Sequence, residues 1–336
     1  QGPGTILDAA VVPNADFACR IDTKGMLDSP IGRKIAGNRK QTAEAAPEKA
    51  AAADWNARIK EATGLQPEDV KEIRISACLA DLSVPGRRQA PDLSQLPAVV
   101  ALVLLKPITF DQLKSAAALA NEKTKKAEIS ELTCIGRRAL AVTSKDPGGV
   151  AVFSAVSDDG LVVLATLNES SLAGALSRIA GGKAERPTVT LAGKGADPAA
   201  HLQASFVPPD AIREKIKQAI AENQKGAGFG ANMILAVVKP FENLKRASLL
   251  ATFTDTATVV LSAELGSQQD AEQLTALLQG VIIPLVQGGT SPDSADSVAS
   301  LASKLSVKSD GASLIVSLKL TEQDLAPAPQ PVESPK

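Results

Sequence analysis

The N-terminal half of the chain alternates segments of period two with segments of helical period. Residues 16–22 (DFACRID) and 72–79 (EIRISACL) alternate apolar and polar positions, as half-buried strands do, and 99–105 is a continuous apolar strand. The segments between and after them predict, in order, a short helix around 26–35, a helix ending at Gly64, a helix capped by Thr109, hairpins over 132–142 and 150–167, and a helix over 170–179.

The C-terminal half repeats part of this order. A strand at 258–265, a helix around 270–274 and a hairpin over 305–316 follow one another as their N-terminal counterparts do. We therefore predict an internal duplication in which 99–142 and 258–316 superpose, and chance similarity of common patterns is the alternative. Before this second copy come a strand at 202–206, a helix over 209–220 and an apolar segment at 233–238.

Hairpins separated by single helices indicate an α+β fold. The expected architecture is two related units of antiparallel sheet with helices packed on one face, for which the ferredoxin-like strand-helix-hairpin order is the nearest simple pattern. The Gly- and Pro-containing stretch 183–198 predicts a linker between an N-terminal domain (1–182) and a C-terminal domain (199–325). The Pro-rich tail, 326–336, is expected to be disordered.

The charge balance offers no global attraction to polyanions. The 336 residues include 36 basic and 37 acidic side chains, giving a net charge of −1, which disfavours nucleic acid as a partner. Aromatic residues make up only 2% of the chain, so platforms for stacking sugars or bases would depend on one Trp and seven Phe.

Histidine and cysteine content restricts metal and redox chemistry. A single histidine, His201, excludes sites that need two imidazole ligands, and neither a metal nor a cofactor is predicted. Cys19, Cys78 and Cys134 are an odd number, and the first two point to opposite faces of their strands. Buried free thiols are therefore expected, with one disulfide as the alternative. No apolar run reaches the roughly 18 residues of a membrane span.

Two Asp-containing turns are similar to the Asp-Thr/Ser-Gly motif of aspartic proteases. Asp22 belongs to a motif interrupted by Lys24, and Asp310 stands where a hairpin favours Asp-Gly. The chain has no Tyr, so it lacks the tyrosine-bearing flap of those enzymes. We interpret both motifs as turns and caps, and retain Asp22 and Asp310 as candidate catalytic acids of a hydrolase.

Two arginine pairs are candidate ligand-binding residues. Arg87-Arg88 and Arg137-Arg138, with lysines at 123, 125 and 126, are typical of a patch for phosphate or sulfated glycans, and solvated loop charges are the alternative. The glycine-rich segments 193–195 and 225–230 lack the spacing or setting of a phosphate-binding loop. His201 is interpreted as a strand-end residue, since the chain has no Gly-x-Ser-x-Gly motif.

Residues 12–35 (VPNADFACRIDTKGMLDSPIGRKI) resemble the opening of uncharacterised exported proteins of planctomycete and verrucomicrobial bacteria. The shared pattern is Pro-x-Asp-Ala, a strand, Asp, and then Leu-x-Ser-Pro-hydrophobic-Gly-basic, and Asn14 breaks the order of its first part. The resemblance implies export to the periplasm, cell surface or medium, and it transfers no catalytic residue. A chain that begins at Gln1 fits removal of a signal peptide, and a trimmed chain is the alternative.

The leading hypothesis is an exported, non-enzymatic protein that contacts a protein or a glycan through its sheet edges or concave faces. An extracellular hydrolase or peptidase acting on glycoproteins such as mucin is the alternative, because some gut members of those bacterial groups degrade mucin. A second alternative is weak binding of nucleic acid or sulfated glycan through the basic loops. The partner and the oligomeric state are left open.

Overall fold

The computed structural model describes residues 11–34, 60, 63–81, 93–146, 149–181, 199–224, 239–284 and 303–325 of the chain. The strands of these ranges are β1 (Phe17–Ile21), β2 (Val70–Ala77), β3 (Ala98–Leu104), β4 (Ala127–Cys134), β5 (Arg137–Ser144), β6 (Ala151–Val156), β7 (Val162–Thr166), β8 (Leu202–Phe206), β9 (Arg246–Phe253), β10 (Thr256–Glu264), β11 (Leu305–Asp310) and β12 (Ser313–Thr321). The helices are α2 (Thr23–Asp28), α5 (Phe110–Thr124), α6 (Glu169–Gly181), α7 (Asp210–Gln224) and α9 (Gln268–Leu277).

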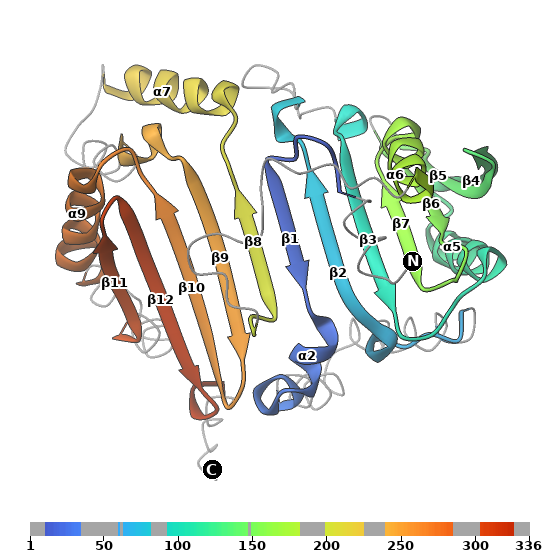
Figure 1. The fold of residues 1–336 in the computed structure, drawn as a ribbon, viewed down its shortest axis with the longest axis horizontal. Coiled ribbons are helices and arrows are strands. Elements are labelled where there is room, and N and C mark those ends of the chain that lie inside the picture. The colour runs from blue at the N-terminus through green and yellow to red at the C-terminus, as the bar shows by residue number, and fades with distance from the viewer. Residues whose placement is uncertain are drawn as a thin grey trace, which may run out of the picture.

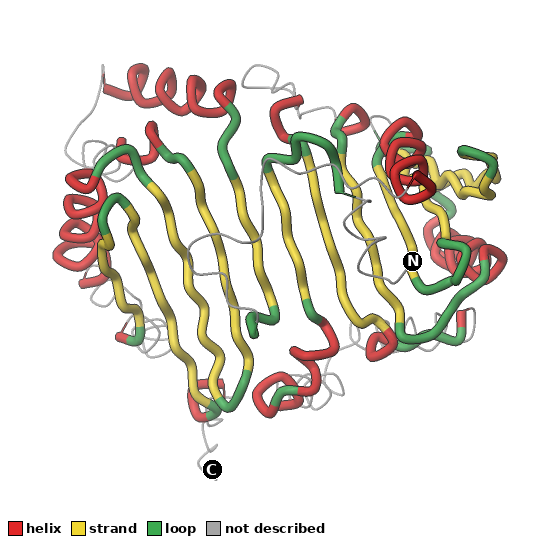
Figure 2. Tube along the Cα trace, viewed as in Figure 1, coloured by secondary structure: helices red, strands yellow, loops and turns green. Residues whose placement is uncertain are grey.

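All the described strands belong to one sheet; Figures 1 and 2 show it face on from β11 to β7, and β4, β5 and β6 curl away from that plane. Its order is β11-β12-β10-β9-β8-β1-β2-β3-β7-β6-β5-β4, and each neighbouring pair is antiparallel. The N-terminal part of the chain builds one half of the sheet and the C-terminal part builds the other. In each half, three strands run outwards, a helix leads to the outer edge, and the remaining strands return.

The predicted α+β class is confirmed, but the two expected sheets are one. Strands β1 and β8 join the halves through a register that runs from Phe17 opposite Phe206 to Ile21 opposite Leu202. The ferredoxin-like duplication is not confirmed, because the matched hairpins occupy different places. Strand β12 pairs with β10, whereas β7 and β6 separate β5 from β3. An additional returning hairpin in the N-terminal half accounts for this difference in strand order.

Local sequence explains where α5 begins and ends. Thr109 forms the predicted cap: its side chain accepts a hydrogen bond from the Gln112 backbone N–H, and the Gln112 side chain accepts one from the Thr109 N–H at 2.8 Å. This reciprocal pair satisfies two N–H groups that a helix start leaves unpaired. The helix ends at Lys125, whose left-handed conformation (φ 51°) terminates the α-helical hydrogen-bond pattern.

Helices cover the two ends of the sheet, and they do so on both faces rather than on one as expected. Helix α6 buries Leu172 and Leu176 against Val99 and Leu164 on one face. Helix α5 packs Leu113 near Leu102, Leu104 and Val163 on the opposite face. Helix α9 packs on β11 and β12, where it buries Leu274 with Ala263, Val307 and Leu314 on the same face as α5.

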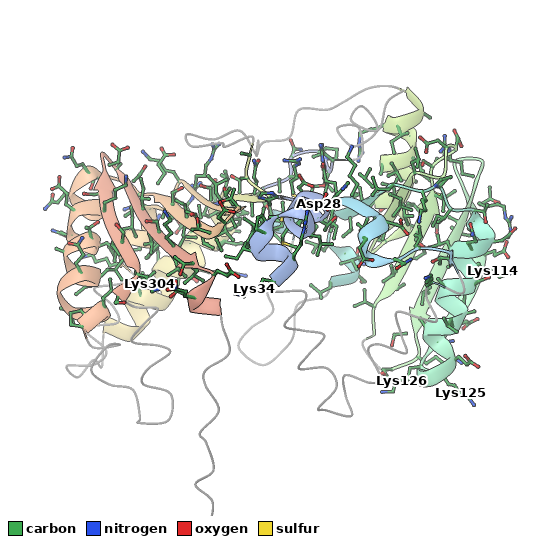
Figure 3. The ribbon with its side chains drawn as sticks, turned by 90° about the horizontal axis from the view of Figure 1, so that it is seen from below. Asp28, Lys34, Lys114, Lys125, Lys126 and Lys304 are labelled. Atoms are coloured by element: carbon green, nitrogen blue, oxygen red, sulfur yellow. The ribbon has the colours of Figure 1, made fainter. Side chains whose placement is uncertain are left out.

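Figure 3 shows the sheet from below, with Lys114 on α5 at one end and Lys304 towards the other. Asp28 and Lys34, at and beyond α2, lie between them. No helix of the described ranges has both the length and the apolar character needed to cross a bilayer.

Several predicted segments lie outside the described residues: most of the helix before Gly64, the linker 183–198, the glycine segments, the apolar segment 233–238 and the tail 326–336.

Candidate functional site

The two candidate acids lie far apart in the sheet. Asp22 follows β1 and caps α2, accepting a hydrogen bond from the Gly25 N–H at 2.8 Å. Asp310 ends β11 at the turn into β12, and it is exposed. Strand β11 is five positions from β1, and the registers place the β11–β12 turn at the opposite end of the sheet from Asp22. The structure therefore does not form the acidic pair that a protease-like hydrolase requires.

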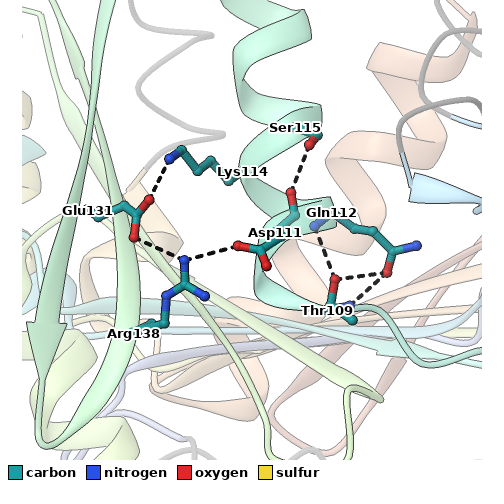
Figure 4. Close-up of polar contacts among 7 residues, drawn as sticks. All are labelled: Thr109, Asp111, Gln112, Lys114, Ser115, Glu131 and Arg138. Carbon is teal, nitrogen blue, oxygen red and sulfur yellow. Dashed lines mark hydrogen bonds and ion pairs between the residues drawn. The ribbon is translucent and has the colours of Figure 1, made fainter.

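Arg138 is already held by carboxylates and an aromatic ring (Figure 4). Its guanidinium contacts Asp111 at 3.0 Å and Glu131 at 3.1 Å, and lies 4.2 Å from the centre of the Phe110 ring. Lys114 also pairs with Glu131, at 2.5 Å. Hydrogen bonding to Lys114 first, and to Arg138 second, lowers the pKa of Glu131, while Glu131 raises the pKa of Arg138. The cluster ties α5 to the β4–β5 hairpin.

Arg137 borders an open depression of about 530 Å³ between three connections. The lining segments are 107–110, 136–138 and 156–160. Arg137 pairs with Asp158 at 2.7 Å, and Asp159 lies beside it with a pKa lowered chiefly by its hydrogen bond from Ser157. Carboxylates in and around this depression match or outnumber the arginines, so it carries no excess positive charge to attract an anion. The other predicted pair, Arg87 and Arg88, lies outside the described residues.

The histidine and the cysteines, the other side chains suited to catalysis or metal binding, are packed or hydrogen-bonded within the fold. His201 accepts a hydrogen bond from the Phe253 N–H at Nδ1 (3.1 Å) and meets the Phe253 ring edge-on at 5.9 Å. The three cysteines are buried and form no disulfide with one another, and burial raises the pKa of the Cys19 and Cys134 thiols. In the ranges that the structure describes, no three His, Cys, Asp or Glu side chains gather as a metal site would need.

A surface that no motif marks is built by one face of the middle strands. Residues directly opposite each other on paired strands point to the same face of a sheet, and alternate residues along a strand share it. Ile21 is opposite Ile73 on one side and Leu202 on the other. Following the register outwards from this pair gives what we call the apolar face: Leu261 and Val259 (β10), Leu249 and Ala251 (β9), Ala204 and Leu202 (β8), Cys19 and Ile21 (β1), Ile75 and Ile73 (β2), Val100 and Leu102 (β3).

The apolar face is partly open to solvent. Leu261 is 46% exposed, and most of the other large side chains of the face are half-buried rather than buried. Leu305, level with Val259 on the same side of the sheet, is 36% exposed. The described helices α5 and α9 pack on the two ends of this side and leave the middle between them.

The opposite face of β10, β9, β8, β1 and β2 is mainly polar, whereas that of β3 belongs to the core under α6. The polar part carries Arg20, Arg74 and the buried carboxylate of Glu72, which pairs with both arginines. Further along, Ser248 and Ser262 share a hydrogen bond of 2.6 Å. In a sheet with one buried and one wet face, the apolar side is the one that is normally covered. Here the apolar side of the middle strands is therefore the unusual surface.

The chemistry of the apolar face allows binding and offers little for catalysis. Cys19 is its one titratable side chain, 8% exposed and with a raised pKa. The strands that carry the apolar face have a hydrogen-bonded neighbouring strand on both sides, which engages their backbone N–H and C=O groups. A molecule lying on this face would meet hydrocarbon without donors, acceptors, acids or bases.

Comparisons with known proteins do not assign the chain to a family. No family model matches the chain, and no curated protein matches it. A solved structure, crystal form I of TP0453, aligns over 94% of this chain and 93% of its own, with 10% sequence identity and a TM-score of 0.37. A likeness at this level supports no argument about function.

Proposed function

We propose that this protein is a non-enzymatic binding protein that holds an apolar partner against the apolar face of its sheet. The observation that carries the proposal is the run of mostly half-buried aliphatic side chains, with the exposed Leu261, across β10, β9, β8, β1, β2 and β3. Contiguous apolar surface of this kind is uncommon on soluble monomers and marks interaction sites. Covering it gains about 25 cal/mol for each Å² removed from water.

The face favours an apolar partner over a glycan. Sugars are held by hydrogen bonds and by stacking on aromatic rings, and the twelve side chains of the apolar face include no aromatic ring and no side-chain oxygen or nitrogen. The hydrolase alternative is not supported by the positions of Asp22 and Asp310. Binding of nucleic acid through Arg137 and Arg138 is not supported by their carboxylate partners.

A fluorescence titration with 1-anilinonaphthalene-8-sulfonate tests the proposal, because this dye reports accessible apolar surface. We expect the native protein to bind the dye and Leu261→Lys to bind it several-fold more weakly. Val260→Lys is the matched control: it places the same charge on the same strand but on the other face. Equal loss in both variants, or no loss in Leu261→Lys with its fold intact by circular dichroism, would reject the apolar face as the binding surface.

Export is a separate proposal, supported by the resemblance of residues 12–35. Fractionation of the source cells with an antibody against the chain tests it. Recovery with the periplasmic, surface or secreted material is expected, and recovery with the cytosol would reject it.

A further inference from the structure

We propose that the occupant of the apolar face is a long acyl chain of a single lipid molecule, lying extended across the strands. This inference rests on the proposed function and names the chemistry of its partner. It follows from three properties of the face: its lack of polar groups, its dimensions, and the covered hydrocarbon that continues it at each end.

The lack of polar groups argues for a plain hydrocarbon. Protein–protein interfaces carry about one hydrogen bond for each 100–200 Å². The twelve residues of the apolar face provide no side-chain oxygen or nitrogen, and the backbone of its strands is already paired on both sides. An extended peptide would bring backbone N–H and C=O groups that find no partner across the middle of this surface. An alkyl chain brings none.

The dimensions fit one extended chain. From β10 to β3 the face crosses five strand intervals, which at about 4.8 Å each span about 24 Å. Its two rows of side chains, represented by Cys19 and Ile21, are about 7 Å apart along the strand. One leaflet of a bilayer core is about 15 Å thick, so an extended acyl chain fits within the length of the face.

Each row of the apolar face meets a covered core at one end. Beyond β10, the row of Leu261 continues to Val316 and Val307, which pack with α9, whereas the row of Val259 continues to the exposed Leu305. Beyond β3, the row of Leu102 continues to Val163, which belongs to the buried cluster against which Leu113 of α5 packs. A chain that crosses from the row of Leu261 at β10 to the row of Leu102 at β3 therefore has covered hydrocarbon at each end as well as beneath it.

A chain-length series tests the inference directly. The probe is cis-parinaric acid, a fluorescent fatty acid, displaced by unlabelled straight-chain fatty acids of increasing length. Half-burial of each methylene on an open face predicts affinity that rises about two-fold per carbon, so that a twelve-carbon acid binds about 16-fold more tightly than an eight-carbon acid. The increase should stop once the chain exceeds the length of the face.

Matched substitutions locate the binding. Leu261→Lys and Leu249→Lys introduce a charge on the apolar face and should weaken binding about ten-fold or more. Val260→Lys and Leu250→Lys are on the same two strands but on the other face. They should leave the affinity for the fatty acid within about two-fold of that of the parent protein. Each variant is compared only after its circular dichroism and thermal melting show a folded protein.

Cys19 supplies a second readout inside the face. In a variant with Cys78→Ala and Cys134→Ala, Cys19 is the one remaining thiol. Saturating dodecanoic acid should slow its reaction with a small thiol reagent several-fold. An unchanged rate with bound acid would mean that the lipid lies elsewhere, and would overturn the inference.

The outcomes separate the two proposals. Dye binding that depends on Leu261, without fatty-acid binding or without a dependence on chain length, would reject the acyl chain and keep an apolar partner, such as an amphipathic helix. Fatty-acid binding that is unaffected by Leu261→Lys and Leu249→Lys would also reject this site for the acyl chain. If neither dye nor fatty acid responds to these substitutions, both proposals fail.

Discussion

Ile135 has an unusual backbone conformation for a β-branched residue. It lies at the β4–β5 turn with φ 50°, followed by Gly136 at φ 72°, and it is 57% exposed. Two-residue turns with positive φ favour Asn-Gly, and the left-handed region costs ordinary L-residues about 1–2 kcal/mol. We expect Ile135→Asn to raise the free energy of unfolding by about 1 kcal/mol, measured by urea denaturation. Ile135→Val keeps the branched side chain, so a similar gain in that variant would contradict the explanation.

Asp324 links the end of β12 to Lys304, which precedes β11. Its carboxylate pairs with Lys304 and accepts hydrogen bonds from the Thr321 N–H (2.7 Å) and hydroxyl (2.8 Å), and these contacts, with Lys304 first, lower its pKa from 3.8 to about 2. A carboxylate with a lowered pKa in the folded state stabilises the protein above its unfolded pKa, and this stabilisation disappears as the pH falls through the folded value.

The parent protein should therefore lose stability relative to Asp324→Asn as the pH falls from about 4 to about 2. Urea denaturation at several pH values checks this, with the difference between the two proteins largest at the upper end of the range. Asp310→Asn removes an exposed carboxylate from the turn between the same two strands and is the control. A pH-independent difference for Asp324→Asn would mean that the ion pair is not the cause.

Among the elements, α5 owes its start to a single capping residue. Replacing Thr109 with Ala removes the acceptor for the Gln112 N–H and should destabilise the protein by about 0.5–2 kcal/mol, measured by thermal or urea unfolding. Ser115 lies one turn further along the same helix and donates to the Asp111 carbonyl. Ser115→Ala should change stability by less than about 0.5 kcal/mol, because Ala is a better helix former. Equal effects of the two changes would assign the loss to helix content rather than to the cap.

Most elements can be predicted from the sequence because their patterns are local. The alternation in DFACRID gives β1, the Thr109 cap gives α5, and the turn around Gly160 gives the β6–β7 hairpin. Strand β9 is not predicted, although Leu249, Ala251 and Phe253 alternate with other residues, because Leu250 blurs the period-two contrast.

The candidate site, unlike the helices and strands, depends on how strands that are far apart in the sequence pair with one another. Each strand shows an apolar phase on its own, but the sequence does not state that the phase of β10 continues on β9, β8 and β1. That depends on pairings such as Ile21 with Leu202, which are remote in the chain. Motif searches instead lead to Asp22, Asp310 and the arginines, whose residue types are equally suited to caps, turns and ion pairs.

At the scale of the whole molecule, one sheet contains cores that share no residue. The core under α6 includes Leu172, and the core under α9 includes Leu274; they lie in opposite halves of the sheet. Regions with separate cores open separately. Leu274→Ala should cost about 2–5 kcal/mol and reduce hydrogen-exchange protection in β10, β11 and β12 while leaving β3 and β7 nearly unchanged. Leu172→Ala should do the reverse. Loss of protection throughout the sheet in both variants would show a single cooperative unit.

The position of β1 at the centre of the sheet sets a condition on synthesis of the chain. One edge of β1 pairs with β2, which follows soon after, but the other edge pairs with β8, and about 180 residues separate Ile21 from Leu202. At about 5–20 residues per second, roughly 10–40 seconds pass between translation of β1 and translation of its second neighbour. During that interval a growing chain presents an unpaired strand edge, which is a template for pairing with other chains. We therefore expect the growing chain to need protection of that edge, by a chaperone or by slow assembly of the first half.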